Sequence, residues 1–484
     1  MTMSNPQKTA IAADGGTVAA MVAGLVARAR TAQAVAEGYD QARIDEIVAA
    51  AGWAIIEPAR NRELAEMAVA DTGVGDVADK IRKNHRKTLG LLRDLAGAKS
   101  VGVISEDAER GIVEIARSVG VVCAITPSTN PAATPANKII NALKGRNAVI
   151  VAPSPKGWST AARLIAFIHA QFDRIGAPHD LVQLLPSPVN KQSTAELMRQ
   201  CDLVVATGSQ SNVRNAATCG TPAFGVGAGN VAGIVDETAD IALAAGRVLR
   251  SKTFDNATSC SSENSLVIVR SVREAMLAAL AERGAVLLDA SQKAKLQQLM
   301  WPDGKLSPAV IGQSATVIAQ RAGFDEIAQT QPKILLVEED SQQGFGDDHP
   351  FSGEKLSPVL TVYTAVDFDD AVRTVRRIYS HQGAGHSVGL HSRVADRALH
   401  LGLTLPVSRV IVDQAHCIAT GGSFDNGLPF SLSMGCGTWG GNNFSDNMNY
   451  RHYLNITRIS RPIPEKVPTE REIFGAYFDK YGTA

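Results

Sequence analysis

Hydrophobic residues in the first hundred positions recur at helical spacing. From residue 17 to about residue 95, Ala, Leu, Ile and Val return every three or four positions among Arg, Glu and Asp, which predicts several amphipathic helices. Residues 101–122 (VGVISEDAERGIVEIARSVGVV) instead alternate β-branched and polar residues around a polar turn near residues 106–109. This alternation predicts a β-hairpin that serves as an arm.

From residue 121 onward, short apolar runs alternate with helical stretches. The runs VVCAIT, NAVIVAP, LVQLLP and DLVVATG are typical of strands, with helical patterns over residues 136–143, 160–172 and 193–200 between them. This alternation predicts parallel βαβ units and hence a doubly wound nucleotide-binding sheet. After residue 260 the pattern returns in SLVIV, AVLLD, PKILLVE, PVLTVYTA and HSVGLHS, with helices over residues 273–282 and 368–378. We therefore expect a second α/β domain.

These patterns divide the chain of 484 residues, which is too long for a single hydrophobic core. We expect an α/β protein with a doubly wound, nucleotide-binding domain over residues 1–230, which carries the hairpin arm at residues 100–120, and a second α/β domain over residues 231–440. Residues 441–484, with the strand-like HYLNITRI, should form an oligomerisation strand and a tail. Pairing such an edge strand across a two-fold axis satisfies the free backbone N–H and C=O groups of both copies. A homodimer or homotetramer is therefore expected.

Charge and composition exclude several classes of function. Lys plus Arg and Asp plus Glu number 48 each, so neither nucleic acid nor an anionic membrane surface is expected as a partner. The six cysteines lack CxxC or Cys/His spacing, and we expect no metal site and no disulfide framework. The apolar stretch at residues 17–26 is too short for a membrane span and follows mostly polar residues, unlike a signal peptide. A cytoplasmic protein with reduced thiols is expected.

Cys260 stands in the segment TFDNATSCSSENSLVIV, after small polar residues and before an apolar strand. This segment resembles the nucleophile loop of the aldehyde dehydrogenase superfamily, and the resemblance implies the aldehyde dehydrogenase fold with Cys260 as catalytic nucleophile. A thiolate adds to an aldehyde carbonyl, and the resulting thiohemiacetal surrenders a hydride to nicotinamide and leaves a thioester. A free thiol has a pKa of about 8.5, so Cys260 needs local help to ionise. The alternative is a buried structural cysteine.

Asn130 lies in ITPSTNPAATPANKIINALKGRNAVIVAPSP, which resembles the superfamily segment that holds an oxyanion-stabilising asparagine and the first cofactor contacts. An amide N–H of Asn130 and the backbone N–H of Cys260 would together stabilise the oxyanion by roughly 3–4 kcal/mol. An Asn between Thr and Pro is otherwise typical of a turn. The resemblance also implies that Thr126, Pro127 and Ser128 contact the cofactor.

Two other segments resemble cofactor-binding parts of the superfamily. TGSQSNVRNA is similar to its Gly-Ser turn over the cofactor diphosphate, where a helix N-terminus would offer free N–H donors, although Thr-Gly-Ser is also a common strand-to-helix turn. HPFSGEKLSPVLTVY matches the place of a glutamate that holds the nicotinamide ribose, although a solvated loop acid is the alternative. The implied cofactor-binding residues are Thr207, Gly208, Ser209, Gly227, Glu354 and Leu356.

The choice between NAD and NADP depends on the segment VIVAPSPKG. The superfamily's usual lysine after the second cofactor-domain strand is replaced, and the segment offers Ser154 and Lys156 as cofactor contacts. No acid follows that would repel a 2′-phosphate, and Lys156 would attract one. Either cofactor fits, with a slight preference for NADP.

The whole chain resembles the CoA-acylating branch of the superfamily most, in pieces such as ADTGVGDVADKIRKNH and MGCGTWGGNNFSDN. A chemical argument supports this independently. Hydrolytic relatives carry a general-base glutamate in a Glu-Leu-Gly-Gly segment, whereas here Val226 takes that place and no carboxylate lies between Thr221 and Val235. Without a base that activates water, the thioester should survive until coenzyme A takes the acyl group. The alternative is a hydrolytic aldehyde dehydrogenase that releases a free carboxylic acid.

The proton acceptor for coenzyme A and the aldehyde itself are left open by the sequence. His386 in GAGHSVGLHS matches a Gly-His-Ser/Thr element of the acylating branch and would suit proton removal from a thiol. A structural histidine whose ring nitrogens are hydrogen-bonded at the start of a strand fits the sequence equally well. Acetaldehyde, propionaldehyde and sulfoacetaldehyde are all compatible, and residues 427–465 look closest to the sulfoacetaldehyde group. A sulfonate needs a cation or N–H donors near the nucleophile. Arg117, Lys138 and Arg214 are candidates by their place in the sequence.

Overall fold

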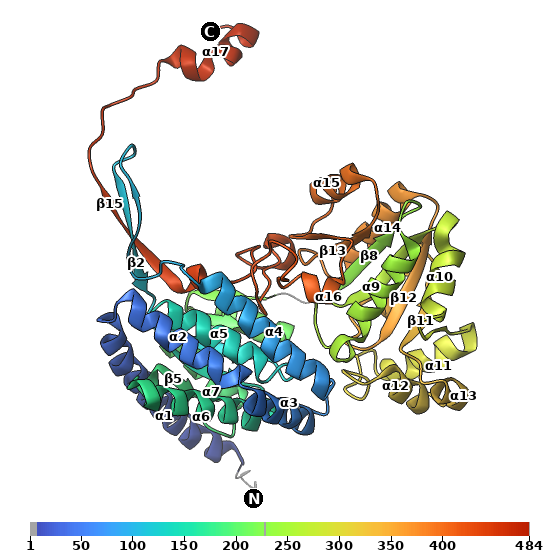
Figure 1. The fold of residues 1–484 in the computed structure, drawn as a ribbon, viewed down its shortest axis with the longest axis horizontal. Helices are drawn as coiled ribbons and strands as arrows, with labels where there is room; N and C mark the ends of the chain where they lie inside the picture. Colours follow the sequence, from blue (N-terminus) through green and yellow to red (C-terminus); the bar gives the residue numbers. More distant parts are fainter. Residues whose placement is uncertain (1–6, 227–228, 484) are drawn as a thin grey trace, which may run out of the picture.

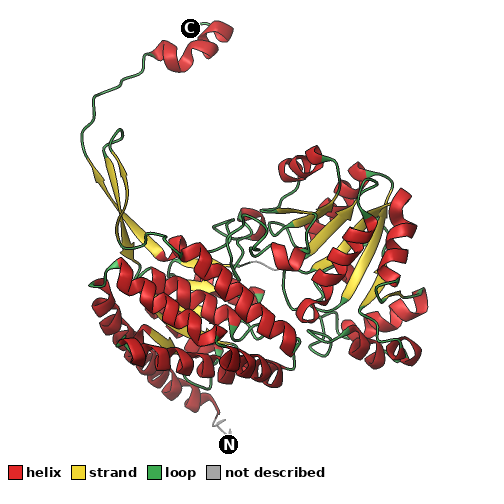
Figure 2. Ribbon diagram, in the orientation of Figure 1, coloured by secondary structure: helices red, strands yellow, loops and turns green. Residues whose placement is uncertain are grey.

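The computed structural model describes residues 7–226 and 229–483 (Figures 1 and 2). Their strands form three sheets, of which two are parallel and carry the two α/β units while the third is a small antiparallel sheet. The predicted α/β architecture, with two α/β units and a β arm, is therefore confirmed.

Four helices open the described chain, as the helical spacing predicted. They are α1 (Gln7–Glu37), α2 (Gln41–Ile56), α3 (Pro58–Thr72) and α4 (Val77–Leu95). The side chains of Asp40, Glu57 and Asp76 accept hydrogen bonds from the first-turn backbone N–H groups of α2, α3 and α4, which fixes where each helix begins. Gly73 ends α3 with φ of 68°, a backbone conformation that favours glycine.

The first sheet has the strand order β5-β4-β3-β6-β7, and all its pairings are parallel. Its elements are β3 (Val121–Thr126), α5 (Ala133–Lys144), β4 (Ala148–Pro153), α6 (Trp158–Ile175), β5 (Val182–Leu184), α7 (Lys191–Gln200), β6 (Leu203–Ala206), α8 (Gln210–Thr218) and β7 (Ala223–Gly225). The chain builds outward from β3 to β5 and then returns to the other side of β3 with β6. The strand order thus reverses between β3 and β6, and ligands of open α/β sheets bind in the crevice at such a point.

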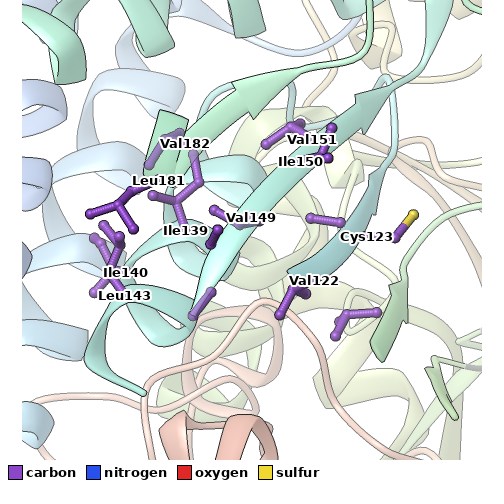
Figure 3. Close-up of a cluster of buried hydrophobic side chains, with 14 of the residues drawn as sticks. Val122, Cys123, Ile139, Ile140, Leu143, Val149, Ile150, Val151, Leu181 and Val182 are labelled. Carbon is purple, nitrogen blue, oxygen red and sulfur yellow. The ribbon is translucent and has the colours of Figure 1, made fainter. Parts of the chain in front are cut away.

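The core of this unit explains why its strands were predictable. Every residue of β3, β4 and β6 is buried, and Figure 3 shows Val149 of β4 beside Ile139 of α5, in the same hydrophobic cluster as Val122 and Leu143. Strands that are covered on both faces carry continuous apolar runs rather than an alternating pattern.

The second unit is a parallel sheet with the order β10-β11-β12-β9-β8-β13-β14. Its strands are β8 (Val231–Val235), β9 (Glu263–Val269), β10 (Ala285–Leu287), β11 (Ile334–Glu338), β12 (Val359–Ala365), β13 (Val388–His391) and β14 (Val410–Val412). Its helices are α9 (Ile241–Thr253), α10 (Arg273–Ala281), α11 (Ala290–Met300), α12 (Ala315–Arg321), α13 (Asp325–Gln329), α14 (Phe368–His381), α15 (Ala395–Thr404) and α16 (His416–Ala419). Strands β7 and β8 were not predicted, because glycines interrupt their apolar runs in FGVGAGNVAGIVD. Even so, β8 pairs with both β9 and β13 inside the sheet.

The predicted hairpin is present as β1 (Gly102–Asp107) and β2 (Ile112–Ser118), and the late strand β15 (Leu454–Ser460) pairs with β2. The arm projects from the first unit, and α17 (Glu470–Tyr481) lies beyond it (Figure 1). Phe430 packs in the core of the first unit, although the second domain was expected to run to residue 440. Over the described residues, no helix combines the length and the apolar character that crossing a bilayer requires.

Candidate active site

Cys260 follows a strained loop that joins α9 to β9. In the short helical turn η3 (Phe254–Ala257), Asp255, Asn256 and Ala257 have φ between 50° and 58°, a left-handed conformation that costs about 1–2 kcal/mol for each residue that is not glycine. The amide of Asn256 donates to two backbone carbonyls of neighbouring loops at 3.1 and 3.2 Å. These contacts hold the loop, and the loop in turn sets the position of Cys260.

The thiol of Cys260 lies in a crowded environment. A Cβ atom at Gly229 would lie 1.8 Å from the carbonyl oxygen of Cys260, so only glycine fits beside the nucleophile. Burial raises the pKa of the Cys260 thiol well above its usual range, and the Glu354 carboxylate and two nearby thiols raise it further, while Arg409 opposes them. The resting thiol is therefore protonated at neutral pH.

Arg409 is a buried cation without a carboxylate partner. Its guanidinium donates to the side-chain oxygen of Asn447 at 2.6 Å and to the carbonyl oxygens of Gly435 and Ser445, both at 2.9 Å. Within the described chain it forms no ion pair, and its charge acts on Cys260. Arg409 thus favours the thiolate form of the nucleophile.

Asn130 lies in the turn between β3 and α5 and is half-buried. Its Oδ1 accepts a hydrogen bond of 2.8 Å from the Lys83 ammonium on α4. Its Nδ2 lies 3.4 Å from the hydroxyl oxygen of Thr129. Asn130 and Ser259, the residue before the nucleophile, line the same cavity, so the structure brings these two predicted parts of the site together.

This cavity, of about 770 Å³, lies between α3 and α4 of the first unit and α9 and η3 of the second. Its lining is strongly basic, and Asp79 is the acid among the described residues that line it. The basic residues of the lining are Arg62, Arg82, Lys83, His85, Arg86, Lys87 and Arg250. Arg82 pairs with Asp79, and Lys83 pairs with Asp255. The cavity therefore keeps an excess of positive charge.

Arg86 and Arg250 carry much of this excess. The Arg86 guanidinium lies over the Phe424 ring at 5.2 Å and donates to the hydroxyl of Ser423, while its buried Nε has no hydrogen-bond partner in the described chain. Burial lowers the pKa of Arg86, and the charge of Arg250 lowers it further, although Asp425 opposes this. For Arg250 the described residues provide neither an ion pair nor a hydrogen bond. An anion between the two guanidinium groups would relieve their repulsion.

The sequence candidates for anion binding lie elsewhere. Arg117 is in β2 and contacts Glu37 at 3.5 Å, Lys138 is buried and donates to strand carbonyls at 2.6 and 2.8 Å, and Arg214 is exposed on α8. None of the three lines the basic cavity. The signal that could have found the cavity is α4 itself, whose helical face with Lys80, Lys83 and Lys87 is buried where apolar residues are expected.

A second cavity, of about 390 Å³, lies at the carboxyl ends of β3 and β4. Thr126 and Ser154 line it, and the buried hydroxyl of Thr126 has no hydrogen-bond partner among the described residues. Pro127 and Ser128 follow in the half-buried turn after β3, and Lys156 is exposed beside the cavity in the turn η1 (Pro155–Gly157). The cavity is at the strand-order reversal, where a dinucleotide would bind.

The strand-turn-helix predicted at residues 207–209 is present between β6 and α8. Gly208 has φ of 141°, and the Ser209 hydroxyl caps α8 by accepting from the backbone N–H of Asn212 at 3.3 Å. The Thr207 hydroxyl lies 3.0 Å from that of Ser433. The first-turn N–H groups of α8 are thus oriented as a phosphate group requires.

The remaining predicted cofactor residues lie near the nucleophile or outside the described chain. Burial raises the pKa of Glu354 to about 8, against the charges of Lys252 and Lys355 and a hydrogen bond from the Gly229 backbone N–H. Leu356 has φ of 44°, and its carbonyl accepts from Gly312 at 2.8 Å. Gly227 lies outside the described residues.

Comparisons with known proteins agree with this geometry. The sequence profile of the Aldehyde dehydrogenase family matches residues 3–295. The acylating sulfoacetaldehyde dehydrogenase of Cupriavidus necator is 68% identical over 461 residues, which cover 95% of this chain and 93% of the relative. That of Bilophila wadsworthia is 43% identical over 94% of this chain and 98% of the relative. The crystal structure of an acetylating aldehyde dehydrogenase from Geobacillus thermoglucosidasius has a TM-score of 0.89 and 33% identity, and covers 94% of this chain and 99% of that chain.

The chain belongs to the aldehyde dehydrogenase family. The predicted fold, the predicted enzyme class and the predicted place in the acylating branch are confirmed. This aldehyde dehydrogenase is accordingly an oxidoreductase, and its site residues can be interpreted with that chemistry.

His386 of this aldehyde dehydrogenase is fully buried before β13. Its Nδ1 lies 2.8 Å from the hydroxyl oxygen of Ser387, which lies 2.9 Å from Nε2 of His416. Nε2 of His386 has no hydrogen-bond partner within residues 7–226 and 229–483. Burial lowers the pKa of His386 to about 3, and the Arg409 charge adds to this effect. The imidazole is therefore neutral at pH 7, and in this buried state it is a weak base.

We expect the alkylation rate of Cys260 by iodoacetamide to rise about tenfold for each pH unit between pH 7 and pH 9, because the thiolate fraction grows at this rate below a raised pKa. Mass spectrometry of the labelled peptide measures the rate. The Cys260→Ala variant gives the background from half-buried Cys219. A rate that levels off below pH 8 would show that the thiol is activated instead.

Proposed function

We propose that this enzyme oxidises sulfoacetaldehyde to its coenzyme A thioester, with a nicotinamide cofactor as oxidant. The observation that carries the proposal is the basic cavity, in which Arg86 and Arg250 share a lining with Asn130 and with the residue before Cys260. A sulfonate on a short aldehyde would meet these guanidinium groups while its carbonyl carbon reaches the sulfur. The two relatives named as acylating sulfoacetaldehyde dehydrogenases support this substrate.

The first step forms the covalent bond at Cys260. The thiol gives up its proton to solvent, and the sulfur bonds the carbonyl carbon while negative charge moves to the carbonyl oxygen. Nδ2 of Asn130 and the backbone N–H of Cys260 donate to this oxygen, and Arg409 stabilises the thiolate that attacks. A bound nicotinamide would supply the hydride acceptor, and the thiohemiacetal on Cys260 would become a thioester when its hydride is transferred.

The residues around the second cavity fit a dinucleotide. Thr126 and Ser154 offer hydroxyl groups, and the N-terminus of α8 offers backbone N–H donors to phosphate groups. Among the described residues that line the cavity there is no acid, whereas Lys191 lines it and Lys156 lies beside it. These charges favour NADP over NAD, because an acid at this place would repel the 2′-phosphate.

The second step transfers the acyl group to coenzyme A. Val226 is buried and supplies no base, and Glu354, with a pKa of about 8, is mostly protonated at neutral pH, so neither activates water. His386 takes the thiol proton of coenzyme A at Nε2, which requires that bound coenzyme A raise the pKa of the imidazole from about 3 toward its usual range. The coenzyme A sulfur then bonds the acyl carbon, and the Cys260 sulfur leaves as a thiolate.

We expect a burst of reduced cofactor of about one equivalent per active site when aldehyde and oxidised cofactor are mixed without coenzyme A, followed by a slow steady state. The thioester forms but has no acceptor, so coenzyme A should restore rapid turnover. Stopped-flow absorbance of the reduced cofactor measures both phases, and Cys260→Ala should show neither. Rapid formation of free acid without coenzyme A would favour the hydrolytic alternative.

We expect Arg86→Met and Arg250→Met each to lower kcat/KM for sulfoacetaldehyde about 10- to 100-fold, as the loss of a charged hydrogen bond to the sulfonate predicts. The fall with propionaldehyde should be much smaller, since it has no anionic group. Steady-state kinetics with both aldehydes measures the ratio. Arg393→Met is the matched control, because Arg393 is 71% exposed and pairs with Asp240 outside the cavity lining. Equal losses with both aldehydes would contradict the sulfonate assignment.

The six cysteines bear on the compartment in which the enzyme works. None of the six forms a disulfide within the described residues, and four of them are buried. Free thiols persist in a reducing compartment, where a nucleophilic cysteine is also protected from oxidation. We propose the cytoplasm on this ground.

We propose that the arm and the tail pair with a second copy of the chain. The hairpin and β15 form a sheet with open edges, and α17 has no buried residue while Ile473, Phe474, Tyr477 and Tyr481 are exposed on it. Pairing with an identical copy would give an open sheet edge its missing backbone hydrogen bonds and would remove an uncovered apolar face from water.

We expect the full chain to be a homodimer or homotetramer at micromolar concentration. Removal of residues 461–484 should lower the number of subunits in the assembly, because the tail carries the uncovered apolar helix. Light scattering coupled to gel filtration measures both masses. A full-length monomer would contradict the proposal.

A further inference from the structure

Lys83 connects the nucleophile loop to the turn that carries Asn130. It lies on α4, its side chain is 5% exposed, and the carboxylate of its partner Asp255 is fully buried. Its Nζ donates to Oδ1 of Asn130 at 2.8 Å, to the hydroxyl of Thr258 at 3.3 Å and to the Asp255 carboxylate. All three N–H groups of the Lys83 ammonium therefore donate to residues that surround the active site.

The contact between Lys83 and Asn130 decides which way the amide faces. An ammonium group only donates, so the oxygen of the Asn130 amide must face it and the NH₂ group must face away. The NH₂ group has a single long contact, of 3.4 Å, to Thr129, which leaves an N–H without a partner among the described residues, and Asn130 lines the basic cavity. An ammonium at the amide oxygen also polarises the amide, which makes its N–H a stronger donor.

Asp255 keeps the charge of Lys83 from acting on the substrate directly. Its carboxylate also accepts from the Asp76 backbone N–H at 2.9 Å, from Lys80 at 3.2 Å and from the Thr258 hydroxyl at 2.8 Å. Burial raises the pKa of Asp255, but the charges of Lys83 and Lys80 outweigh it and hold the pKa below its usual range. The carboxylate is thus ionised and partly neutralises the ammonium pair.

We propose that Lys83 is a positioning residue for the oxyanion site: by holding Oδ1 of Asn130, it aims Nδ2 at the carbonyl oxygen of the aldehyde that Cys260 attacks. This inference rests on the proposed function, in which Asn130 stabilises the oxyanion. Because Lys83 also lines the basic cavity, direct binding of the sulfonate is the competing role. A neutral aldehyde separates the two roles, since every aldehyde forms an oxyanion but only sulfoacetaldehyde carries a sulfonate.

The test is a double-mutant cycle between Lys83→Met and Asn130→Ala, read in the burst rate with propionaldehyde and with sulfoacetaldehyde. We expect Asn130→Ala to slow the burst about 100-fold or more and Lys83→Met to slow it about 10- to 100-fold with both aldehydes. The double variant should be no slower than Asn130→Ala, because Lys83 acts through Asn130. The KM for each aldehyde should change little.

Lys80→Met is the matched control. Lys80 is buried on the same helix and contacts the same Asp255, but its other hydrogen bond is to the Thr129 carbonyl rather than to the Asn130 side chain. We expect it to slow the burst less than Lys83→Met does, because Lys83 still pairs with Asp255, and its loss should add to that of Asn130→Ala. Thermal melting followed by circular dichroism compares the folding of all variants. If Lys83→Met does not fold, Lys83→Gln replaces it in the cycle, because its polar amide is tolerated better beside Asp255 but lacks the charge and the third N–H of the ammonium group.

Four results would overturn the inference. These are additive losses in the double variant, a loss confined to sulfoacetaldehyde, an equal loss in Lys80→Met, and a slow Asn130→Ala beside an unaffected Lys83→Met. An unchanged burst in Asn130→Ala would instead refute the oxyanion role on which the inference rests.

Discussion

The buried ion pair between Asp255 and two lysines of α4 is the constraint on which the active site depends. Asp255 belongs to the nucleophile loop of the second unit, and Lys80 and Lys83 belong to the helical layer of the first. Breaking one partner of a buried pair costs about 3–5 kcal/mol, because a charge is left without compensation. The pair therefore fixes the nucleophile loop against the first unit, and with it the relation of Cys260 to the turn that carries Asn130.

The same loop shows why this constraint is needed. Three consecutive residues with left-handed backbone precede Thr258, and without external contacts such a segment would relax to a more favourable conformation. The carboxylate and the amide of the first two, Asp255 and Asn256, hold the loop by reaching across to the segment before α4 and to α4 itself. Ion pairing thus maintains a backbone geometry that local preferences oppose.

The charged side chains near Cys260 and those in the basic cavity have different roles. Arg409 lies near Cys260 without a carboxylate partner, while the high pKa of Glu354 keeps a second negative charge away at neutral pH. Arg86 and Arg250 lie in the cavity beside it. A net charge of zero for the whole chain conceals this local excess of cations, because net charge describes interactions with large partners rather than the field inside one cavity.

The sequence by itself determined the elements that local chemistry specifies. Buried parallel strands appear as apolar runs, so β3, β4 and β9 were predicted, whereas glycine-interrupted β8 was not. The segments around Cys260 and residues 207–209 were identified by their resemblance to segments of the aldehyde dehydrogenase superfamily. The tertiary structure alone decided that Arg86 and Arg250 share a cavity and that Lys83 contacts Asn130 and Asp255, which lie 47 and 172 positions away. Periodicity shows which face of α4 is distinctive, but not what packs against that face, because pairing between distant elements depends on the packing of the whole chain.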